Sequence, residues 1–262
     1  MTYIVVLMAI TKREAFRFLQ QKGRFVSALV RPLVWLFVFA AGFRAALGLS
    51  IMPPYQTYIQ YETYIVPGLC GMILLFNGMQ SSFSLIYDRE MGSMKLLFTS
   101  PLPRWWLLLC KLIGSVFVSL LQVYVFLFIT FLYGIRIPEI GYLTAFPAFI
   151  VAGFLMGSLG LFLSSFIRQL ENFAGVMNFI IFPMFFLSSA LYPLWKMSES
   201  SKLLHDICVL NPFTHAVELI RFALYGQWNS SAFLITMCAA IVFFGLAEWG
   251  YNPTKVSKKG NI

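Results

Sequence analysis

The chain has 262 residues, of which 60% are hydrophobic and only 11% are charged, and its formal net charge is +9. Because a soluble domain carries about 25% charged residues, this composition excludes an ordinary water-soluble fold. The composition predicts an all-α integral membrane protein, with residues 1–262 forming one transmembrane domain. Membrane orientation accounts for the positive charge, so we expect no nucleic-acid partner.

Residues 1–25 have the pattern of a helix that lies on a membrane surface. Phe16, Leu19 and Phe25 recur at helical spacing among several Lys and Arg residues. A helix with an apolar face and a basic face binds at the interface of an anionic leaflet. We therefore predict an interfacial helix over 1–25, with a plain cytoplasmic extension as the alternative.

Six apolar stretches can cross a bilayer, which takes about 20 helical residues each. The first contains Arg31 and Arg44, both near its ends, where a long side chain can reach the headgroups. The predicted transmembrane helices cover residues 27–49, 63–87, 105–133, 141–167, 172–193 and 229–249.

The distribution of Lys and Arg predicts how these helices are oriented. If both termini are cytoplasmic, 14 of the 19 basic residues lie inside and 5 lie outside. The positive-inside rule favours this arrangement. We expect a multi-pass protein of the inner (plasma) membrane with the N- and C-termini in the cytoplasm.

The inner segment 88–104 combines a charged cluster with a short apolar helical face, and Pro101 and Pro103 end the helix. A plain linker does not need an exposed apolar face, whereas a docking segment does. The segment therefore predicts a contact with a partner through Asp88, Arg89, Glu90, Met94, Leu97 and Phe98.

The outer segment 194–228 is too charged to span the membrane and too apolar to float free in water. Two amphipathic stripes flank Asn211 and Pro212, a typical helix start. His215, Glu218 and Arg221 follow at intervals of three on the face opposite the second stripe, where Glu218 and Arg221 can pair. We predict two short re-entrant helices in the outer leaflet. A helical hairpin on the surface is the alternative.

Uncharged polar residues inside the predicted spans are candidates for lining a transport pathway. The alternative for each of them is a hydrogen bond between two helices. The candidates are Asn77, Gln80, Gln122, Asn178 and Ser188. Gly153 and Gly157 form a small-xxx-small pair that favours close helix packing.

The sequence contains no phosphate-binding loop, no nucleophile with a base beside it, and no His or Cys pair at metal-ligand spacing. We therefore expect no catalytic residue, no metal and no cofactor in this chain.

Several short motifs occur in a characteristic order. Arg13-Glu14 precedes Arg31-Pro32, and the inner segment contains Gly-Ser, Lys-Leu-Leu and Thr-Ser-Pro after its charged cluster. Tyr192-Pro193-Leu194 then precedes Asn211-Pro212-Phe213 and Arg221. In this order and spacing, the chain resembles the ABC-2 family of transporter permeases over essentially its whole length. These permeases are the membrane subunits of type V ATP-driven exporters.

The resemblance implies a half-transporter that works as a homodimer in membrane lipid. Two copies of a separate cytoplasmic ABC ATPase would bind ATP and Mg and dock on residues 88–99. The family exports lipids, lipid-linked glycans, drugs and similar amphipathic compounds.

A secondary transporter or channel is the main alternative. Such a protein would favour ionisable residues inside the spans, and the predicted spans have no Asp, Glu or His between their ends. A membrane-embedded enzyme is a third class.

Overall fold

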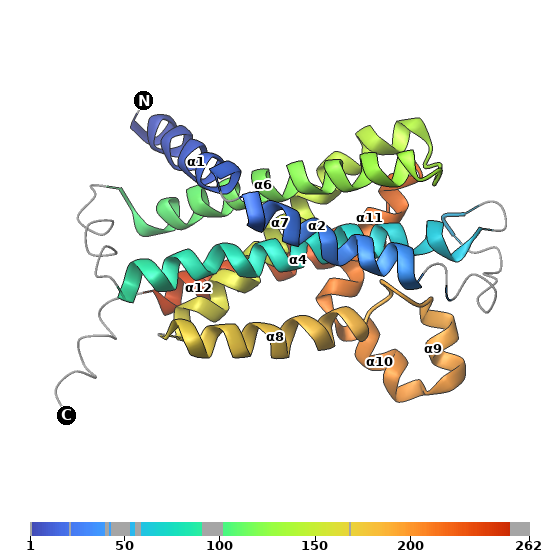
Figure 1. Ribbon diagram of the computed structural model, residues 1–262. Helices are drawn as coiled ribbons and strands as arrows, with labels where there is room; N and C mark the ends of the chain where they lie inside the picture. The colour runs from blue at the N-terminus through green and yellow to red at the C-terminus, as the bar shows by residue number, and fades with distance from the viewer. Residues whose placement is uncertain are drawn as a thin grey trace.

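The computed structural model describes residues 2–20, 22–39, 42, 53–55, 59–90, 102–167 and 169–251. Every element within these ranges is a helix, which confirms the predicted all-α class. The longest helices run side by side as a bundle (Figure 1).

Among the described residues, four helices are long and apolar enough to cross a membrane, and the bent pair Lys202–Leu210 and Pro212–Leu224 would be a fifth span if it counts as one. Each of the four helices coincides with a predicted span to within three residues at either end. They are α4 (Tyr61–Glu90), α6 (Arg104–Leu132), α7 (Glu139–Phe166) and α12 (Ser230–Gly250).

The other two predicted spans are only partly formed in the described residues. The first contains α2 (Lys22–Val34) and a π-helical turn, η1 (Trp35–Phe39), and most of residues 40–49 lie outside the described ranges. The fifth predicted span contains α8 (Leu170–Phe186), which has 17 residues. At 1.5 Å per residue, α8 is about 26 Å long, less than the roughly 30 Å of a hydrocarbon core. The described residues thus hold four or five candidate spans, and the predicted count of six is not confirmed.

Helix α8 ends at Phe186 because its last carbonyl groups bond to another part of the chain. The Asn211 amide nitrogen donates to the carbonyl oxygens of Met184, at 2.7 Å, and Leu187, at 2.6 Å. The chain leaves the helix after these residues and does not continue to residue 193 as predicted.

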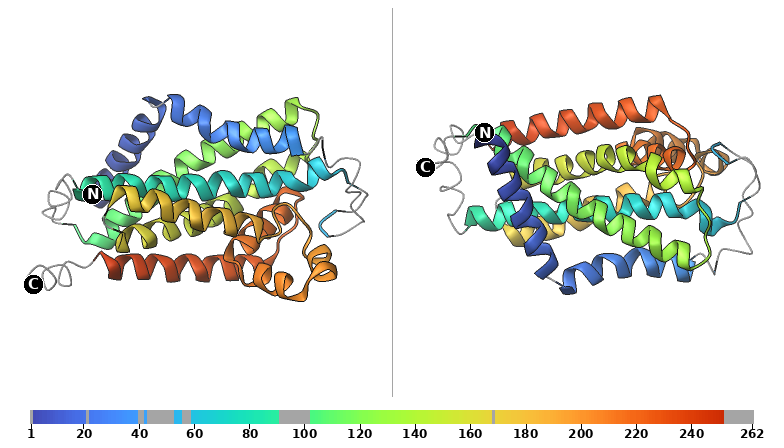
Figure 2. Two further views of the ribbon diagram at one scale, coloured as in Figure 1. Left: turned by 60° about the horizontal axis from the view of Figure 1, so that its bottom comes forward. Right: turned by 90° about the horizontal axis from the view of Figure 1, so that it is seen from above.

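The N-terminal helix α1 (Thr2–Gln20) packs on α6 and crosses the bundle at an angle (Figure 2). The Tyr3 and Trp106 rings form an edge contact with centroids 5.4 Å apart. Ile4, Val5 and Met8 remain exposed. An exposed apolar face is typical of a helix that contacts lipid, and the interfacial location of residues 1–25 stays a prediction.

Helix α7 lies at the centre of the bundle because its glycines, which have no side chain, allow neighbouring helices to pack closely against it. A methyl group on Gly160 would come within 2.6 Å of the Gly78 carbonyl oxygen of α4. A methyl group on Gly157 would overlap the Leu112 side chain of α6, and one on Gly153 would approach Val116 to 3.3 Å. The close packing predicted for Gly153 and Gly157 is confirmed.

Candidate functional site

The outer segment folds into three short helices, α9 (Leu194–Ser200), α10 (Lys202–Leu210) and α11 (Pro212–Leu224). Helices α10 and α11 meet at Asn211 with a bend of 77°. The Asn211 side chain accepts a hydrogen bond from the Phe213 N–H at 3.0 Å, and Pro212 follows at the first helical position. The predicted helix start at Asn211-Pro212 is therefore confirmed. Helix α9 is an addition that the sequence pattern did not predict.

The two apolar stripes of this segment lie in different environments. The α11 stripe, including Phe213, Val217 and Ile220, is fully buried, and α11 packs on α4 and α7. The α10 stripe is exposed, with Leu210 82% accessible. Both helices have the same apolar periodicity, so the sequence alone could not tell which stripe packs inside the protein. The re-entrant position of the pair in a membrane stays a prediction.

Arg221 is the most informative residue of the segment. Its guanidinium forms the predicted ion pair with Glu218, which is confirmed. The same group donates to the Ser189 carbonyl oxygen at 2.6 Å and lies 4.1 Å from the centroid of the Tyr64 ring. Arg221 is 0% exposed. The face opposite the apolar stripe, where the sequence places Arg221, is therefore also buried at this residue.

Arg221 is buried because polar groups from distant parts of the chain surround it. The Tyr64 hydroxyl donates to the Ser189 carbonyl oxygen at 3.0 Å, so Tyr64 and Arg221 share one acceptor. Tyr55 packs beside Tyr64, with ring centroids 6.3 Å apart. We call these five residues (Tyr55, Tyr64, Ser189, Glu218 and Arg221) the Arg221 cluster. The cluster joins the 53–55 segment, α4, the α8–α9 connection and α11.

Tyr55 is a neutral member of the cluster. Burial raises the pKa of Tyr55 to about 12, although the Arg221 guanidinium opposes this shift. Its hydroxyl therefore stays protonated at neutral pH. Arg221 and Glu218 are then the charged groups of the cluster, and each neutralises the other. No local motif marked Tyr55, Tyr64 or Ser189, because only the tertiary fold brings them to Arg221.

His215 lies close to the bend between α10 and α11. Its Nε2 atom is 2.9 Å from the Val209 carbonyl oxygen. A neutral histidine with Nε2 protonated donates this hydrogen bond. The contact holds the end of α10 to the first turn of α11.

Two of the five candidate pathway residues bond to each other. Asn77 of α4 donates to the Gln122 side chain of α6, and both residues are buried. For this pair, the structure supports the alternative of a hydrogen bond between helices. The Ser188 hydroxyl donates to the Phe185 carbonyl oxygen at 2.6 Å within a buried turn. Gln80 is half-buried on α4, and Asn178 is exposed on α8.

Most of the predicted coupling segment lies outside the described residues, including Met94, Leu97 and Phe98. The backbone of Asp88, Arg89 and Glu90 forms the last turn of α4. The Glu90 carboxylate accepts a hydrogen bond from the Leu170 N–H at 2.9 Å. An acceptor at a helix N-terminus stabilises that helix, so Glu90 ties the end of α4 to the start of α8. Coupling by this segment stays a prediction.

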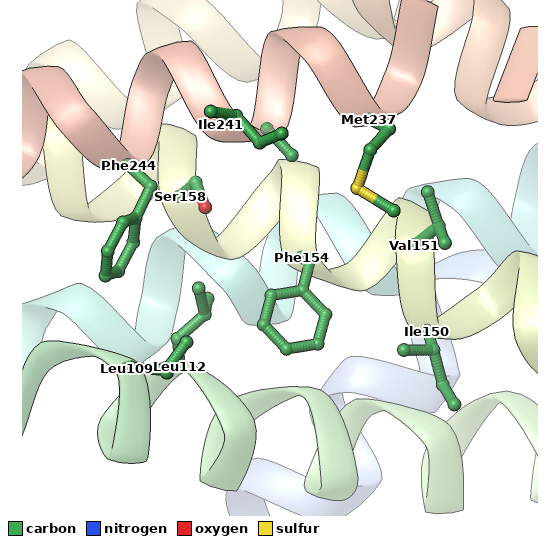
Figure 3. A pocket seen from close by; sticks show the side chains of 10 residues that line it. Leu109, Leu112, Ile150, Val151, Phe154, Ser158, Met237, Ile241 and Phe244 are labelled. Carbon is green, nitrogen blue, oxygen red and sulfur yellow. The ribbon is translucent and has the colours of Figure 1, made fainter. Parts of the chain in front are cut away.

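One cavity of about 320 Å³ lies between α6, α7 and α12 (Figure 3). Its walls are almost entirely apolar and include Leu112, Phe154, Met237, Ile241 and Phe244. An apolar cavity of this kind suits hydrocarbon rather than water. None of the candidate pathway residues lines it. Within the described ranges, no group of three His, Cys, Asp or Glu residues could hold a metal ion.

The long apolar helices α4, α6, α7 and α12 define a multi-pass α-helical membrane protein. Residues 5–225 match the family described as ABC-2 type transporter, and the chain belongs to this family. It is therefore the membrane component of an ABC transporter. The family implies a transport subunit that is not itself an enzyme and that works with an ABC ATPase partner.

Three relatives carry permease names. The chain is 27% identical over 244 residues to a protein of Cyanophora paradoxa named as the transport permease ycf38, covering 90% of this chain and 80% of that one. Its namesake in Porphyra purpurea is 26% identical over 229 residues, covering 84% and 75%. A protein of Escherichia coli (strain K12) named as the multidrug ABC transporter permease YbhR is 28% identical over 170 residues. That match covers 64% of this chain and 45% of YbhR.

Proposed function

We propose that the chain forms the transmembrane pathway of an exporter for amphipathic compounds. The match to the ABC-2 family over residues 5–225 carries this proposal, because it extends from α1 to the end of α11. One relative is named for multidrug transport, which fits an amphipathic cargo such as a drug, a lipid or a lipid-linked glycan.

Two copies of the chain form the pathway, and two copies of a separate ATPase supply the energy. The exposed face of α8 supports the homodimer. Phe179, Phe182 and Phe186 all remain accessible there, and α4 is the main neighbour of α8. Large exposed apolar patches on a protein mark interaction surfaces or lipid contacts. In this arrangement, both termini and the 88–104 segment lie in the cytoplasm, beside the ATPase.

The ATPase subunits bind ATP and Mg, and this chain needs no cofactor. The sequence lacks the Gly-rich loop and the Lys that hold phosphates in ATP-hydrolysing proteins. The chain therefore supplies the pathway, and its partner supplies the chemistry.

The test is reconstitution of the chain in liposomes with its ABC ATPase partner. We expect ATP-dependent movement of a fluorescent amphiphile, lost when the phosphate-loop Lys of the ATPase is replaced. The chain purified alone should not hydrolyse ATP. Transport driven by a proton or sodium gradient without ATP would instead favour a secondary transporter.

A further inference from the structure

An arginine lies at mid-depth on the face formed by α2, α4 and α8. The guanidinium of Arg31 in α2 lies 3.7 Å from the centroid of the Phe76 ring. Phe76 is 15 residues from the start of α4 at Tyr61 and 14 from its end at Glu90, or about 21–22 Å along the helix from each end. The sequence-based expectation that Arg31 reaches the headgroups from the end of its span is therefore wrong.

Arg31 is exposed on this face rather than enclosed within the bundle. The ion pairs found among the described residues join Arg13 to Glu14, His205 to Asp206 and Arg221 to Glu218, so none of them includes Arg31. A charged side chain at membrane depth is costly, and such residues face a partner or a pathway. The contact with Phe76 compensates only in part, since it supplies no anion.

The helix that carries Arg31 is irregular at this position. The next residue, Pro32, lacks an N–H group, and the chain continues as the π-helical turn Trp35–Phe39. Isolated π-helical turns occur often at functional sites. The turn directs Trp35 against Phe185 and Phe186 of α8, with ring centroids 5.7 Å apart in both pairs. The distortion thus brings aromatic rings of α8 close to the segment that holds Arg31.

The same face offers aromatic surface beside the charge. Phe182 of α8 contacts Phe76, with ring centroids 6.5 Å apart, and remains 45% exposed. Phe76 therefore contacts both the cation of α2 and an accessible ring of α8, and α2 and α8 both lie along α4 (Figure 1). A fixed cation next to accessible aromatic rings is complementary to a molecule with one anionic group and an apolar body.

We infer that Arg31, Phe76 and Phe182 form a binding site for an amphipathic anion. The guanidinium binds a carboxylate, sulfate or phosphate group through paired hydrogen bonds, and the exposed rings of α8, Phe182 among them, contact the apolar part. Phe76 is only 9% exposed and supports the guanidinium. This inference rests on the proposed function, because it assigns a substrate class to the proposed exporter and places its site beside the exposed face of α8, where two copies of the chain would form the pathway. Neutral amphiphiles would contact the same rings but lack the interaction with Arg31.

The test uses the full chain in nanodiscs made only of phosphatidylcholine, without ATP or an ATPase. The probe is stearic acid with a photoreactive diazirine in its chain, and the matched neutral probe is its methyl ester. We expect the acid to label peptides of α2, α4 and α8 and the ester to label them about tenfold less, which is the effect of losing one charge-assisted hydrogen-bonded contact.

Arg31→Gln should reduce labelling by the acid to the level of the ester, and Arg31→Lys should retain most of it. Arg136→Gln is the control, because Arg136 is an exposed arginine between α6 and α7 and its loss should change nothing. Equal labelling by acid and ester in the unmodified chain would overturn the inference, even if Arg31→Gln failed to fold. Because the assay measures binding alone, its failure is distinct from a failure of ATP-driven transport.

Discussion

Removing both charges of the Arg221 cluster should destabilise the protein by less than the sum of the two single removals. Glu218→Ala leaves the Arg221 guanidinium 0% exposed and without its carboxylate. Breaking a buried ion pair in this way costs about 3–5 kcal/mol of stability. The Glu218 side chain is 19% exposed, so it is better solvated than the Arg221 side chain.

Arg221→Ala removes different interactions. It loses the hydrogen bond to the Ser189 carbonyl oxygen and the contact with the Tyr64 ring, which are worth about 1.5–3 and about 2 kcal/mol respectively. In the double variant, no charge is left behind, so its cost should be close to that of Arg221→Ala alone. The coupling energy between the two positions should therefore reach about 3 kcal/mol, the upper part of the range for residues in contact.

The assay is a double-mutant cycle on the purified chain in nanodiscs, with the free energy of unfolding measured for each variant. Glu199→Ala is the control, because Glu199 is an exposed carboxylate on α9 and its removal should change stability by less than about 0.5 kcal/mol. Strict additivity of Glu218→Ala and Arg221→Ala would refute the reasoning. So would a Glu218→Ala variant as stable as the control.

Three further predictions concern coupling, topology and packing. Leu97→Asp should abolish co-purification with the ATPase while membrane insertion is retained, and undiminished assembly would remove the inner segment from this role. In a chain whose native cysteines are replaced, a membrane-impermeant thiol reagent should label new cysteines from outside only in the predicted outer segments, and labelling of the inner ones would overturn the topology. The outer segments are 50–62, 134–139 and 196–206, and the inner ones are 88–104 and 254–262. Gly78→Ala should lower the free energy of unfolding by about 1–3 kcal/mol, because its methyl group would lie 2.6 Å from the α7 backbone. Gly175→Ala has nothing within 4 Å and should be neutral or stabilising by up to about 1 kcal/mol; equal effects at both glycines would contradict the packing described here.

The features that the sequence predicted correctly depend on short stretches of chain. Apolar length predicted α4, α6, α7 and α12, and the Asn-Pro pair predicted the start of α11. The Glu218–Arg221 pair followed from helical spacing alone. Each of these features depends on residues within one helix, so it could be predicted without knowing the tertiary contacts.

The features that the sequence missed depend on residues far apart in the chain. Arg221 is buried because Ser189, 32 residues away, turns its carbonyl oxygen toward it. Helix α8 ends early because Asn211, 24 residues beyond Leu187, bonds to its last turn. Asn77 and Gln122, both candidates for a pathway, bond to each other across two helices. Polarity within a span indicates that a partner exists, but it does not identify the partner.

The shared carbonyl oxygen of Ser189 has a mechanical consequence. Because Tyr64 and Arg221 both donate to it, α4, α11 and the start of the α8–α9 connection cannot separate without leaving a buried donor unsatisfied. The close glycine contacts between α4 and α7 also hold these two helices together. Movement that opens a passage would therefore occur elsewhere, for example at the π-helical turn after Pro32, where the regular helical hydrogen bonding is interrupted. Each transport cycle would then move α2 while α4, α7 and α11 stay in place. The energy required from the ATPase would depend on the movement of α2 rather than on that of the whole bundle.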